Sequence, residues 1–307
     1  MNAHRRSALR TIGGMGGLAA LLAINPSFAQ MPNLIQRPIP SSGEKLPVIG
    51  LGTWQVFDAG QDAAARAPLK DVLRVFFAAG GRLVDSSPMY GSSESVVGDL
   101  CSELNACEPL FMATKVWTRG RDEGIREMER SLRRMRVKQM DLMQVHNLLD
   151  VATHTKTLLD WKAQGRVRYT GITHYTASAH AEVEKTLKAA PYDFLQINYS
   201  LAERDAETRL LPLAQERKVA VIINRPFAEG ALFRRVRGKP LPPWAGEIGV
   251  ESWAQYFLKW ILGHPAVTAA IPGTGKAGHM ADNLAAGRGS LPDEPQRRRM
   301  AAYFDAL

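Results

Sequence analysis

Apolar runs rich in β-branched side chains alternate with amphipathic windows along the chain from residue 30 onward. A short apolar run is typical of a buried strand, and apolar residues at three-and-four spacing are typical of a buried helix face. Leu69, Val72 and Phe76 show that helical spacing. The predicted strands cover residues 48–52, 82–85, 110–114, 141–146, 167–173, 194–197, 219–223 and 267–271. The predicted helices cover residues 69–79, 94–104, 122–135, 153–164, 178–189, 207–217 and 250–262.

Polar residues and turn formers mark where several of these elements begin. Ser92, Asp122 and Thr153 stand just before helical windows and are predicted to be N-caps. Residues 33–46 predict a hairpin that turns at Ser41-Ser42-Gly43, ahead of the first strand–helix unit. A further helix is expected at the C-terminal end of the chain.

Strands that alternate with helices build βαβ units and a parallel sheet. Eight such units in residues 30–307 predict a single domain with the (β/α)8 barrel fold. A doubly wound sheet would carry a glycine-rich fingerprint after its first strand, where this chain has Thr53-Trp54-Gln55. The run from Gly273 to Gly278 has the glycine spacing but follows the last strand, so it cannot complete such a unit. A Walker loop is also excluded, because neither Ser nor Thr follows Lys276.

The composition is that of a globular protein. Hydrophobic residues make up 45% and charged residues 22% of the 307 residues, which excludes a disordered, fibrous or polytopic membrane chain. The net charge is +9, and +6 of it belongs to residues 30–307, because residues 1–29 hold three arginines and no acid. An excess this small fits an anionic ligand at least as well as a nucleic acid, and we expect no nucleic-acid partner.

Residues 1–29 are predicted to be a targeting segment. Arg5 and Arg6 lie in a basic head, a weakly apolar stretch follows over residues 12–24, and Ser27-Phe28-Ala29 predicts a cut before Gln30. The stretch is shorter than the roughly 20 helical residues that span a bilayer, so no stable membrane insertion is expected. The segment resembles a twin-arginine signal, which implies the twin-arginine export machinery as a partner and a periplasmic or otherwise exported bacterial protein. A basic N-terminus that stays uncleaved is the alternative.

The chain contains two cysteines, Cys101 and Cys107. Two are too few for a disulfide framework or a four-cysteine zinc site, and no metal is expected. An oxidising compartment would permit a bond between them. Six residues of helix would place the two side chains on different faces, so the sequence predicts two free thiols.

Four side chains with complementary chemistry follow neighbouring predicted strands. Asp85 ends the second strand, with Tyr90 five residues later, while Lys115 follows the third strand and His146 ends the fourth. Active sites of (β/α)8 barrels lie at the C-terminal ends of the strands, so these groups are expected to converge. A phenol has an ordinary pKa near 10, and a neighbouring ammonium lowers that pKa. With a carboxylate to keep the lysine charged and an imidazole to orient a carbonyl, the set suits protonation of an oxygen while hydride reaches its carbon.

Each of these residues also has a purely structural interpretation. Asp85 and Lys115 would form an ion pair between adjacent strands. Tyr90 would cap the barrel, and His146 would be a satisfied core residue. Their occurrence together at consecutive strand ends favours the catalytic interpretation, and no Ser–His or Cys–His pair stands at those ends.

At these positions the chain resembles the aldo-keto reductases, over nearly the whole of residues 30–307. The matching segments are residues 50–54, 85–91, 113–115, 141–146, 196–200 and 271–274. The resemblance implies a (β/α)8 barrel that binds NADPH and reduces aldehydes or ketones. It implies Tyr90 as the proton donor, Lys115 and Asp85 as the groups that tune it, and His146 as the group that orients the substrate.

The resemblance also implies a set of cofactor-binding residues. These are Thr53, Thr173, His174, Gln196, Asn224, Arg225, Pro226, Phe227, Thr274, Lys276, His279 and Asn283. Thr173-His174 stands where the family usually has Ser-Asn to hold the carboxamide. Asn224 replaces the aromatic residue that stacks on the nicotinamide, which leaves Arg225 or Phe227 for that contact.

The phosphate end of the implied cofactor site departs from the family as well. Gly273 and His279 stand where a lysine and an arginine are common, while Lys276 and Asn283 are kept. The sequence therefore favours NADPH over NADH only modestly, and NADH remains possible.

The surroundings of the substrate are predicted from two tryptophans and two loops. The resemblance implies that Trp54 and Trp117 line an apolar pocket. The short loop at residues 147–152 predicts an open pocket with a broad substrate range. The long basic loop at residues 228–249 is either a belt over the cofactor pyrophosphate or a solvated, mobile loop, and the sequence leaves both open.

The leading hypothesis is a monomeric carbonyl reductase with a small carbonyl substrate. A barrel aldolase that forms a Schiff base at Lys115 is disfavoured, because Tyr90 and Asp85 would keep the lysine charged. A cofactor-binding sensor or partner protein of the same fold, with little turnover, is the alternative from another functional class.

Overall fold

A computed structural model describes residues 33–108 and 110–307. The chain divides into two units, Met1–Met31 and Pro32–Leu307, and all elements below belong to the second. The predicted targeting segment and its cut before Gln30 lie outside the described residues.

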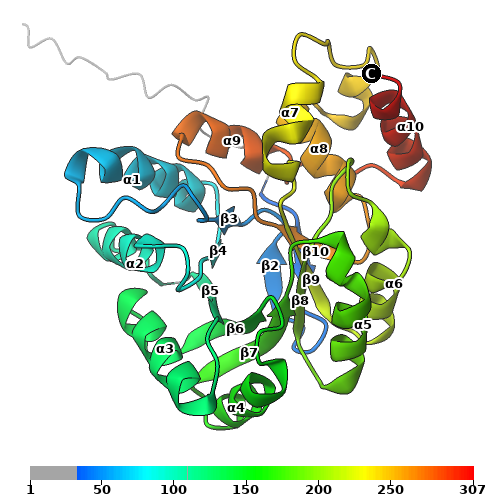
Figure 1. Ribbon diagram of the computed structural model, residues 1–307. Helices are drawn as coiled ribbons and strands as arrows, with labels where there is room; N and C mark the ends of the chain where they lie inside the picture. Colours follow the sequence, from blue (N-terminus) through cyan, green and yellow to red (C-terminus); the bar gives the residue numbers. More distant parts are fainter. Residues whose placement is uncertain (1–32, 109) are drawn as a thin grey trace, which may run out of the picture. The chain divides into compact units, whose positions relative to one another are not determined.

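Eight parallel strands form one sheet in the order β10-β9-β8-β7-β6-β5-β4-β3, and Figure 1 shows them surrounded by helices. The strands are β3 (Leu51–Gly52), β4 (Leu83–Asp85), β5 (Phe111–Val116), β6 (Met140–His146), β7 (Val167–Thr173), β8 (Phe194–Asn198), β9 (Ala220–Asn224) and β10 (Val267–Ala270). Parallel bridges from Ile49 to Ala270 and from Gly52 to Gly273 join the two ends of the sheet. The predicted (β/α)8 barrel, with its N-terminal hairpin and C-terminal helix, is confirmed.

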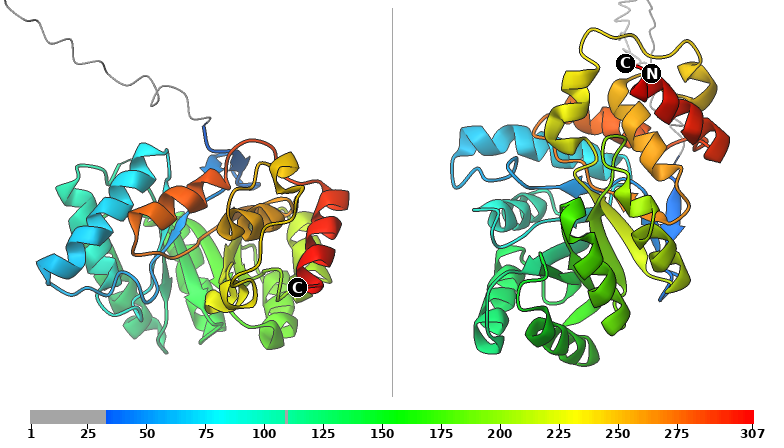
Figure 2. Two further views of the ribbon diagram at one scale, coloured as in Figure 1. Left: turned by 90° about the horizontal axis from the view of Figure 1, so that it is seen from above. Right: turned by 45° about the vertical axis from the view of Figure 1, so that its right-hand side comes forward.

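Helices follow the strands in alternation, as Figures 1 and 2 show. The α-helices are α1 (Ala63–Ala78), α2 (Ser93–Glu103), α3 (Arg121–Arg134), α4 (Val151–Ala163), α5 (His180–Ala189), α6 (Leu210–Glu216), α7 (Ala231–Arg235), α8 (Trp253–Leu262), α9 (Ala277–Ala285) and α10 (Glu294–Asp305). The 3-10 helices are η2 (Ala177–Ala179), η3 (Asp205–Glu207), η4 (Ala228–Gly230) and η5 (Ala245–Ile248).

The alternation of side chains along each strand produces two hydrophobic clusters. The larger cluster contains the apolar helix faces and outward strand residues such as Val84 and Met112. The smaller cluster has no helical member and contains Leu83, Phe111 and Phe194, of which Phe194 on β8 meets Phe111 on β5 across the barrel, so the cluster fills the barrel interior. Strands buried on both faces explain why the sequence shows continuous apolar runs there.

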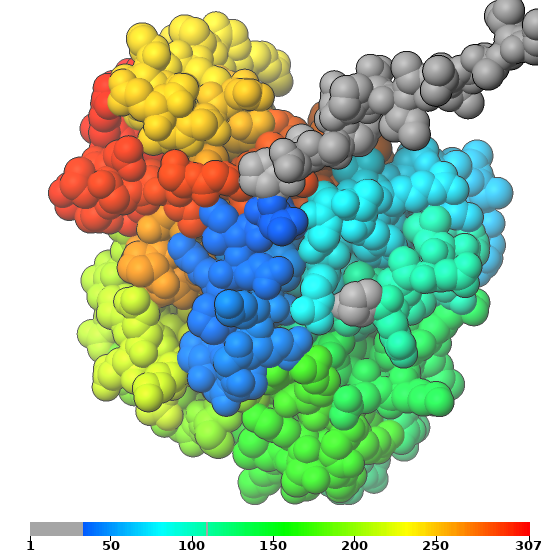
Figure 3. Space-filling view, turned by 180° about the vertical axis from the view of Figure 1, so that it is seen from behind, coloured from blue at the N-terminus to red at the C-terminus, as the bar shows by residue number. Residues whose placement is uncertain are grey.

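A hairpin closes the N-terminal end of the barrel. Its strands β1 (Gln36–Pro38) and β2 (Lys45–Pro47) pair antiparallel around the predicted turn. Ile39 and Leu46 belong to the same interior cluster as the strand residues, so they plug the barrel. Figure 3 shows the hairpin (blue) at the centre of the face opposite to that of Figure 1. Glu44 on the hairpin contacts Arg82 and Arg168, which fixes the plug to the strands.

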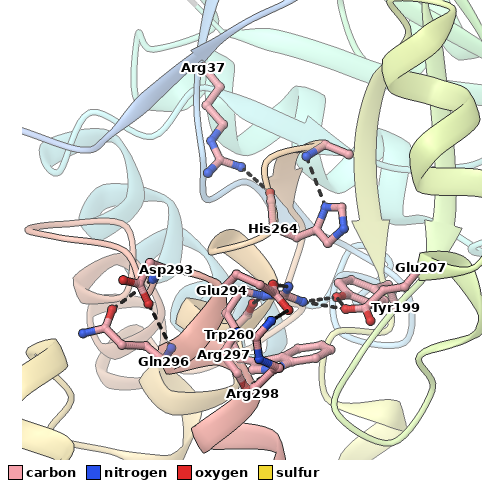
Figure 4. Close-up of polar contacts among 11 residues, drawn as sticks. Arg37, Tyr199, Glu207, Trp260, His264, Asp293, Glu294, Gln296, Arg297 and Arg298 are labelled. Carbon is pink, nitrogen blue, oxygen red and sulfur yellow. Dashed lines mark hydrogen bonds and ion pairs between the residues drawn. The ribbon is translucent and has the colours of Figure 1, made fainter.

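The C-terminal helix is held by one buried guanidinium, drawn in Figure 4. Arg297 on α10 is 4% exposed and donates to Glu207 at 2.6 Å, to Glu294 at 2.6 Å and to the carbonyl of Trp260 at 3.0 Å. It also donates to the Tyr199 hydroxyl at 2.5 Å. The four partners come from α10 itself, α8, η3 and the segment after β8, so one side chain ties these elements together.

Several predicted helix starts are wrong by a few residues. The N-cap of α3 is Gly120 rather than Asp122, and that of α4 is Asp150 rather than Thr153. Helix α1 begins at Ala63, because the Asp62 carboxylate accepts from the backbone N–H of Ala64. Such caps and positive-φ turns are set by one or two polar contacts, which hydrophobic spacing does not register.

The two cysteines are free, as predicted, but the stated reason is wrong. Helix α2 ends at Glu103, and Asn105 takes a left-handed conformation with φ of 51°. The N–H of Ala106 then donates to the carbonyl of Cys101, which is the Schellman pattern of a helix end. The chain reverses there, so Cys107 lies outside the helix that contains Cys101.

Candidate active site

The side chains that point into the barrel change from apolar to polar toward the C-terminal ends of the strands. A group of polar side chains therefore lies at that end, next to the apolar interior. On β5 the inward residues Phe111 and Ala113 are followed by Lys115, and on β6 Leu142 is followed by Gln144 and His146. Lys115 lies beside Gln144 in the strand register. The C-terminal ends of the strands therefore converge on one group of buried polar side chains, as predicted.

Asp85 at the end of β4 is the centre of this group. Its Oδ2 accepts from Lys115 Nζ at 2.7 Å, and both side chains are almost fully buried. Its Oδ1 accepts from Gln196 at 2.8 Å and from Gln144 at 3.3 Å. Lys115 also donates to the carbonyl of Ser86 at 2.6 Å. The carboxylate and the ammonium are thus each satisfied by several partners, as buried charges require.

Tyr90 lies beside Lys115 in the loop after β4. Lys115 Nζ is 5.0 Å from the centre of the phenol ring. Burial raises the pKa of Tyr90, and the charge of Lys115 offsets this only in part, while Asp85 adds to the rise. The sequence expectation of a lowered phenol pKa is therefore wrong for this structure, because desolvation outweighs the ammonium. The pKa of Lys115 is lowered by burial, but Asp85 and Tyr90 outweigh this and raise it.

His146 lies beside Tyr90 in the same site. Its ring meets that of Tyr90 edge-on at 5.9 Å between centroids. Burial, with the charges of Lys115 and His174, lowers the pKa of His146 to about 2. The imidazole is therefore neutral at physiological pH. Its Nδ1 lies 3.1 Å from the hydroxyl of Ser87.

A cavity of about 780 Å³ opens above these side chains. The residues that line it include Asp85, Tyr90 and His146, as well as both predicted tryptophans, Trp54 and Trp117. All large hydrophobic side chains that are exposed in the described residues lie on its wall. They are Trp54, Met89, Trp117, Tyr175 and Phe233.

Seven of the predicted cofactor residues line the same cavity. They are Thr53, Thr173, Gln196, Asn224, Arg225, Pro226 and Phe227. The other five, His174, Thr274, Lys276, His279 and Asn283, do not line it. Lys276 and His279 are exposed at the start of α9, where backbone N–H groups can receive an anion, and Asn283 is buried in that helix.

Two of the lining side chains bear directly on the expected carboxamide grip. Gln196 is engaged by its neighbours, since it donates to Asp85 and its Oε1 accepts from Thr173 at 3.1 Å. Asn224 donates to the carbonyl of His174 at 3.1 Å, while its buried Oδ1 has no partner among the described residues. An unpartnered buried acceptor on a cavity wall fits an amide N–H such as that of a nicotinamide carboxamide.

Arg225 and Phe227, the two residues predicted to stack on the nicotinamide, differ in how their side chains are held. Arg225 has a positive φ of 48°, donates to the carbonyl of Tyr175 at 2.7 Å and lies 3.1 Å from Glu229. Phe227 faces the cavity and packs against Phe233 at 4.8 Å between centroids. The aromatic side chain is therefore the better placed of the two to meet a planar ring.

The basic loop at residues 228–249 contains helical turns. It holds η4, α7 and η5. Arg235 donates to the carbonyls of Phe304 and Asp305 at the C-terminal end of α10, which fixes the loop to that helix. Gly230 and Phe233 reach the cavity wall, so the loop lines the site at one edge.

Sequence reasoning missed Ser87 and Gln144, which contact the predicted tetrad directly. The expectation that no Ser–His pair stands at the strand ends is wrong, because Ser87 lies against His146. Ser87 and Gln144 both carry a signal in the alternation of strand side chains. Gln144 stands between the inward residues Leu142 and His146, and a polar residue in such a position has to find a buried partner. Ser87 is two residues beyond Asp85. No cluster of His, Cys, Asp or Glu that could hold a metal occurs in residues 33–108 and 110–307.

The family model described as "Aldo/keto reductase family" matches residues 48–299. The methylglyoxal reductase YeaE of Escherichia coli (strain K12) is 29% identical over 259 residues, which cover 81% of this chain and 89% of that protein. The NADH-specific methylglyoxal reductase of the same organism is 26% identical over 225 residues, covering 64% and 68% of the two chains.

Solved structures agree with this comparison. An aldo/keto reductase from Klebsiella pneumoniae in complex with NADP and acetate is 25% identical, with a TM-score of 0.71 over 85% of this chain and 93% of that one. An aldo-keto reductase from the same organism in complex with NADPH is 24% identical and shares the fold, with a TM-score of 0.74 over 88% and 96%.

Proposed function

This chain belongs to the aldo/keto reductase family and is an NAD(P)H-dependent oxidoreductase, and we propose that it reduces aldehydes or ketones to alcohols with Tyr90 as the proton donor. The observation that carries the proposal is the convergence of Tyr90, Lys115, Asp85 and His146 at one end of the barrel. Three of the four line the cavity, and Lys115 lies directly behind Tyr90.

The geometry gives each side chain a separate task. The nicotinamide, when bound, supplies hydride to the carbonyl carbon. Tyr90 gives its hydroxyl proton to the carbonyl oxygen, and the ammonium of Lys115 stabilises the phenolate that remains. Asp85 and its amide donors keep Lys115 charged and in place. The neutral imidazole of His146 hydrogen-bonds the carbonyl oxygen and holds it beside the phenol.

In this proposal the dinucleotide lies in extended form from the cavity to the start of α9. Thr173, Asn224 and Phe227 would hold the nicotinamide end, with the free Oδ1 of Asn224 accepting from the carboxamide. Lys276 and the start of α9 would receive the 2′-phosphate.

We expect NADPH to bind more tightly than NADH, by about tenfold or less. Lys276 and the start of α9 remain to contact the 2′-phosphate, but Gly273 and His279 replace the lysine and arginine that commonly bind it. Fluorescence titration of the wild type and of Lys276→Met with both nucleotides tests this. The lysine variant should lose affinity for NADPH and keep that for NADH. An equal loss for both would contradict the assignment of Lys276 to the 2′-phosphate.

The substrate class follows from the cavity wall and from the relatives. Apolar side chains rim the cavity, and two relatives are methylglyoxal reductases. Steady-state turnover with methylglyoxal and with an aromatic aldehyde, followed by oxidation of NADPH, tests the proposal. Tight nucleotide binding without turnover of any aldehyde or ketone would favour the alternative, a cofactor-binding sensor. His174 and Asn224, which differ from the residues usual in the family, support that alternative.

We further propose that the protein is exported by the twin-arginine route. The paired arginines and the residues before Gln30 support this. Among the described residues, no helix has the length and apolar character needed to cross a membrane. A dinucleotide cofactor has to be bound before export, and the twin-arginine route, which carries folded proteins, suits a cofactor-dependent barrel.

A further inference from the structure

Ser87 occupies a fixed position beside His146. Its side chain is fully buried, and its Oγ lies 3.1 Å from His146 Nδ1. The backbone N–H of Met89 points to the same oxygen at 3.4 Å, which forms a turn closed by the serine hydroxyl across Pro88. The proline restricts the backbone of the preceding serine to extended conformations. Both the backbone and the hydroxyl of Ser87 are therefore constrained.

The position of the hydroxyl hydrogen follows from these contacts. A serine hydroxyl has one hydrogen to donate and lone pairs to accept with. Met89 N–H uses a lone pair of Oγ, so the hydrogen still needs an acceptor. Within the described part of the chain, His146 Nδ1 is the only group that can accept a hydrogen bond from the Ser87 hydroxyl, because its other contact, Met89 N–H, is a donor. Nδ1 therefore accepts, and the neutral imidazole carries its own hydrogen on Nε2.

The alternative tautomer would place a lone pair on Nε2. His146 lines the cavity, and Nδ1 is already occupied by Ser87, so Nε2 is the nitrogen left for a substrate. A carbonyl oxygen meets an N–H donor in one tautomer and a second lone pair in the other. Which tautomer is present thus decides whether the imidazole attracts or repels the reacting oxygen.

We propose that Ser87 is a positioning residue that holds His146 in the Nε2–H tautomer, so that the imidazole and Tyr90 donate to the same carbonyl oxygen. This inference rests on the proposed function for its consequence in catalysis. The tautomer itself is a property of the protein without cofactor or substrate.

The tautomer is measured first, by long-range ¹H–¹⁵N correlation NMR of the ¹⁵N-histidine-labelled protein at pH 7. The chain has 7 histidines, and His146→Gln identifies the signals of His146. We expect the wild type to show Nε2 protonated and Nδ1 unprotonated. In Ser87→Ala the preference should fall by about fivefold or more, which corresponds to one hydrogen bond of about 1 kcal/mol. Ser87→Thr, which keeps the hydroxyl, should retain it.

Kinetics then connect the tautomer to catalysis. Ser87→Ala should lower kcat/KM for the aldehyde about five- to tenfold with little change in NADPH affinity, and Ser87→Thr should recover most of that loss. Ser131→Ala is the matched control, because Ser131 on α3 is also a fully buried serine, and its hydroxyl has no partner among the described residues. That variant should leave both the tautomer and turnover unchanged.

The outcomes separate this proposal from the proposed function. A wild-type spectrum with Nδ1 protonated, or a preference for the Nε2–H tautomer that is unchanged in Ser87→Ala, overturns the role of Ser87 even if the enzyme turns over. The expected spectra in a protein without carbonyl reductase activity support the positioning and contradict only the proposed function. If Ser87→Ala does not fold, the wild-type spectrum and Ser87→Thr still decide the tautomer.

Discussion

Asp85 shows how single residues set the chemistry of this site. Its two oxygens receive hydrogen bonds from one ammonium on the adjacent strand β5 and from two amides on the more distant strands β6 and β8. The amides of Gln144 and Gln196 hold the carboxylate in place against Lys115. From this position Asp85 raises the pKa of Lys115, which keeps the ammonium charged beside Tyr90.

The buried histidine should also make stability depend on pH. The pKa of His146 is about 2 in the folded protein and near 6.5 in an unfolded chain, so only the unfolded chain takes up this proton between those values. Stability should therefore fall as the pH drops below about 6.5. When the pH falls from 6.5 to 5.0, the free energy of unfolding of the wild type should decrease by up to about 2 kcal/mol more than that of His146→Gln. Urea unfolding at the two pH values measures this difference.

A matched control distinguishes this effect from the general loss of a histidine. His279 is an exposed histidine on α9. His279→Gln should keep the pH dependence of the wild type. If His146→Gln and His279→Gln show the same slope, the folded protein protonates His146 far more easily than its surroundings indicate.

At the scale of elements, hydrophobic spacing predicted the strands and most of the helices. It succeeded for α2, whose predicted residues 94–104 lie one position from Ser93–Glu103. It missed α9 (Ala277–Ala285), because a short helix that buries few residues leaves little pattern. It could not place the reversal after α2, which depends on the left-handed conformation of Asn105.

The candidate site also has features that the sequence predicted and features that it did not. The strand ends were predictable, since a parallel barrel brings its C-terminal ends together whatever the loops do. The hydrogen bond of Gln196 to Asp85 was not, because it depends on side-chain conformations across the barrel. Nor was the sign of the pKa shift at Tyr90, which is the balance between burial and one charge.

The attachment of α10 yields an element-scale prediction. Arg297 is buried and pairs with Glu207 and Glu294, whereas the side chain of Arg298 is 67% exposed and lies 3.3 Å from Glu294. Removing one partner of a buried pair leaves charge without compensation. Arg297→Met should lower the free energy of unfolding by about 3 kcal/mol, and Arg298→Met by less than about 0.5 kcal/mol. Equal effects in urea unfolding would mean that the guanidinium of Arg297 does not attach the helix.

At the scale of the whole molecule, export and catalysis are linked through the cofactor. A ligand that binds only the folded state stabilises it by mass action, so a barrel loaded with nucleotide is better suited to transport in folded form. The paired arginines would then direct a finished enzyme, and the mature chain would begin at Gln30.

The test of export is a double variant, Arg5→Lys with Arg6→Lys, compared with Arg10→Lys as the control. Cell fractionation should find the double variant retained inside, while the control appears outside and begins at Gln30. Normal amounts of the double variant outside the cytoplasm would show that the segment is not a twin-arginine signal.

The central claim, that Tyr90 protonates the carbonyl oxygen, is tested most directly by Tyr90→Phe. Positioned proton donors typically contribute about 10²–10⁴-fold, so aldehyde turnover should fall by that factor while NADPH binding persists. Tyr169→Phe is the control, because that hydroxyl contacts Ser42 and Glu44 of the hairpin at the other end of the barrel, and this variant should keep its turnover. Near-normal aldehyde reduction by Tyr90→Phe would contradict the account.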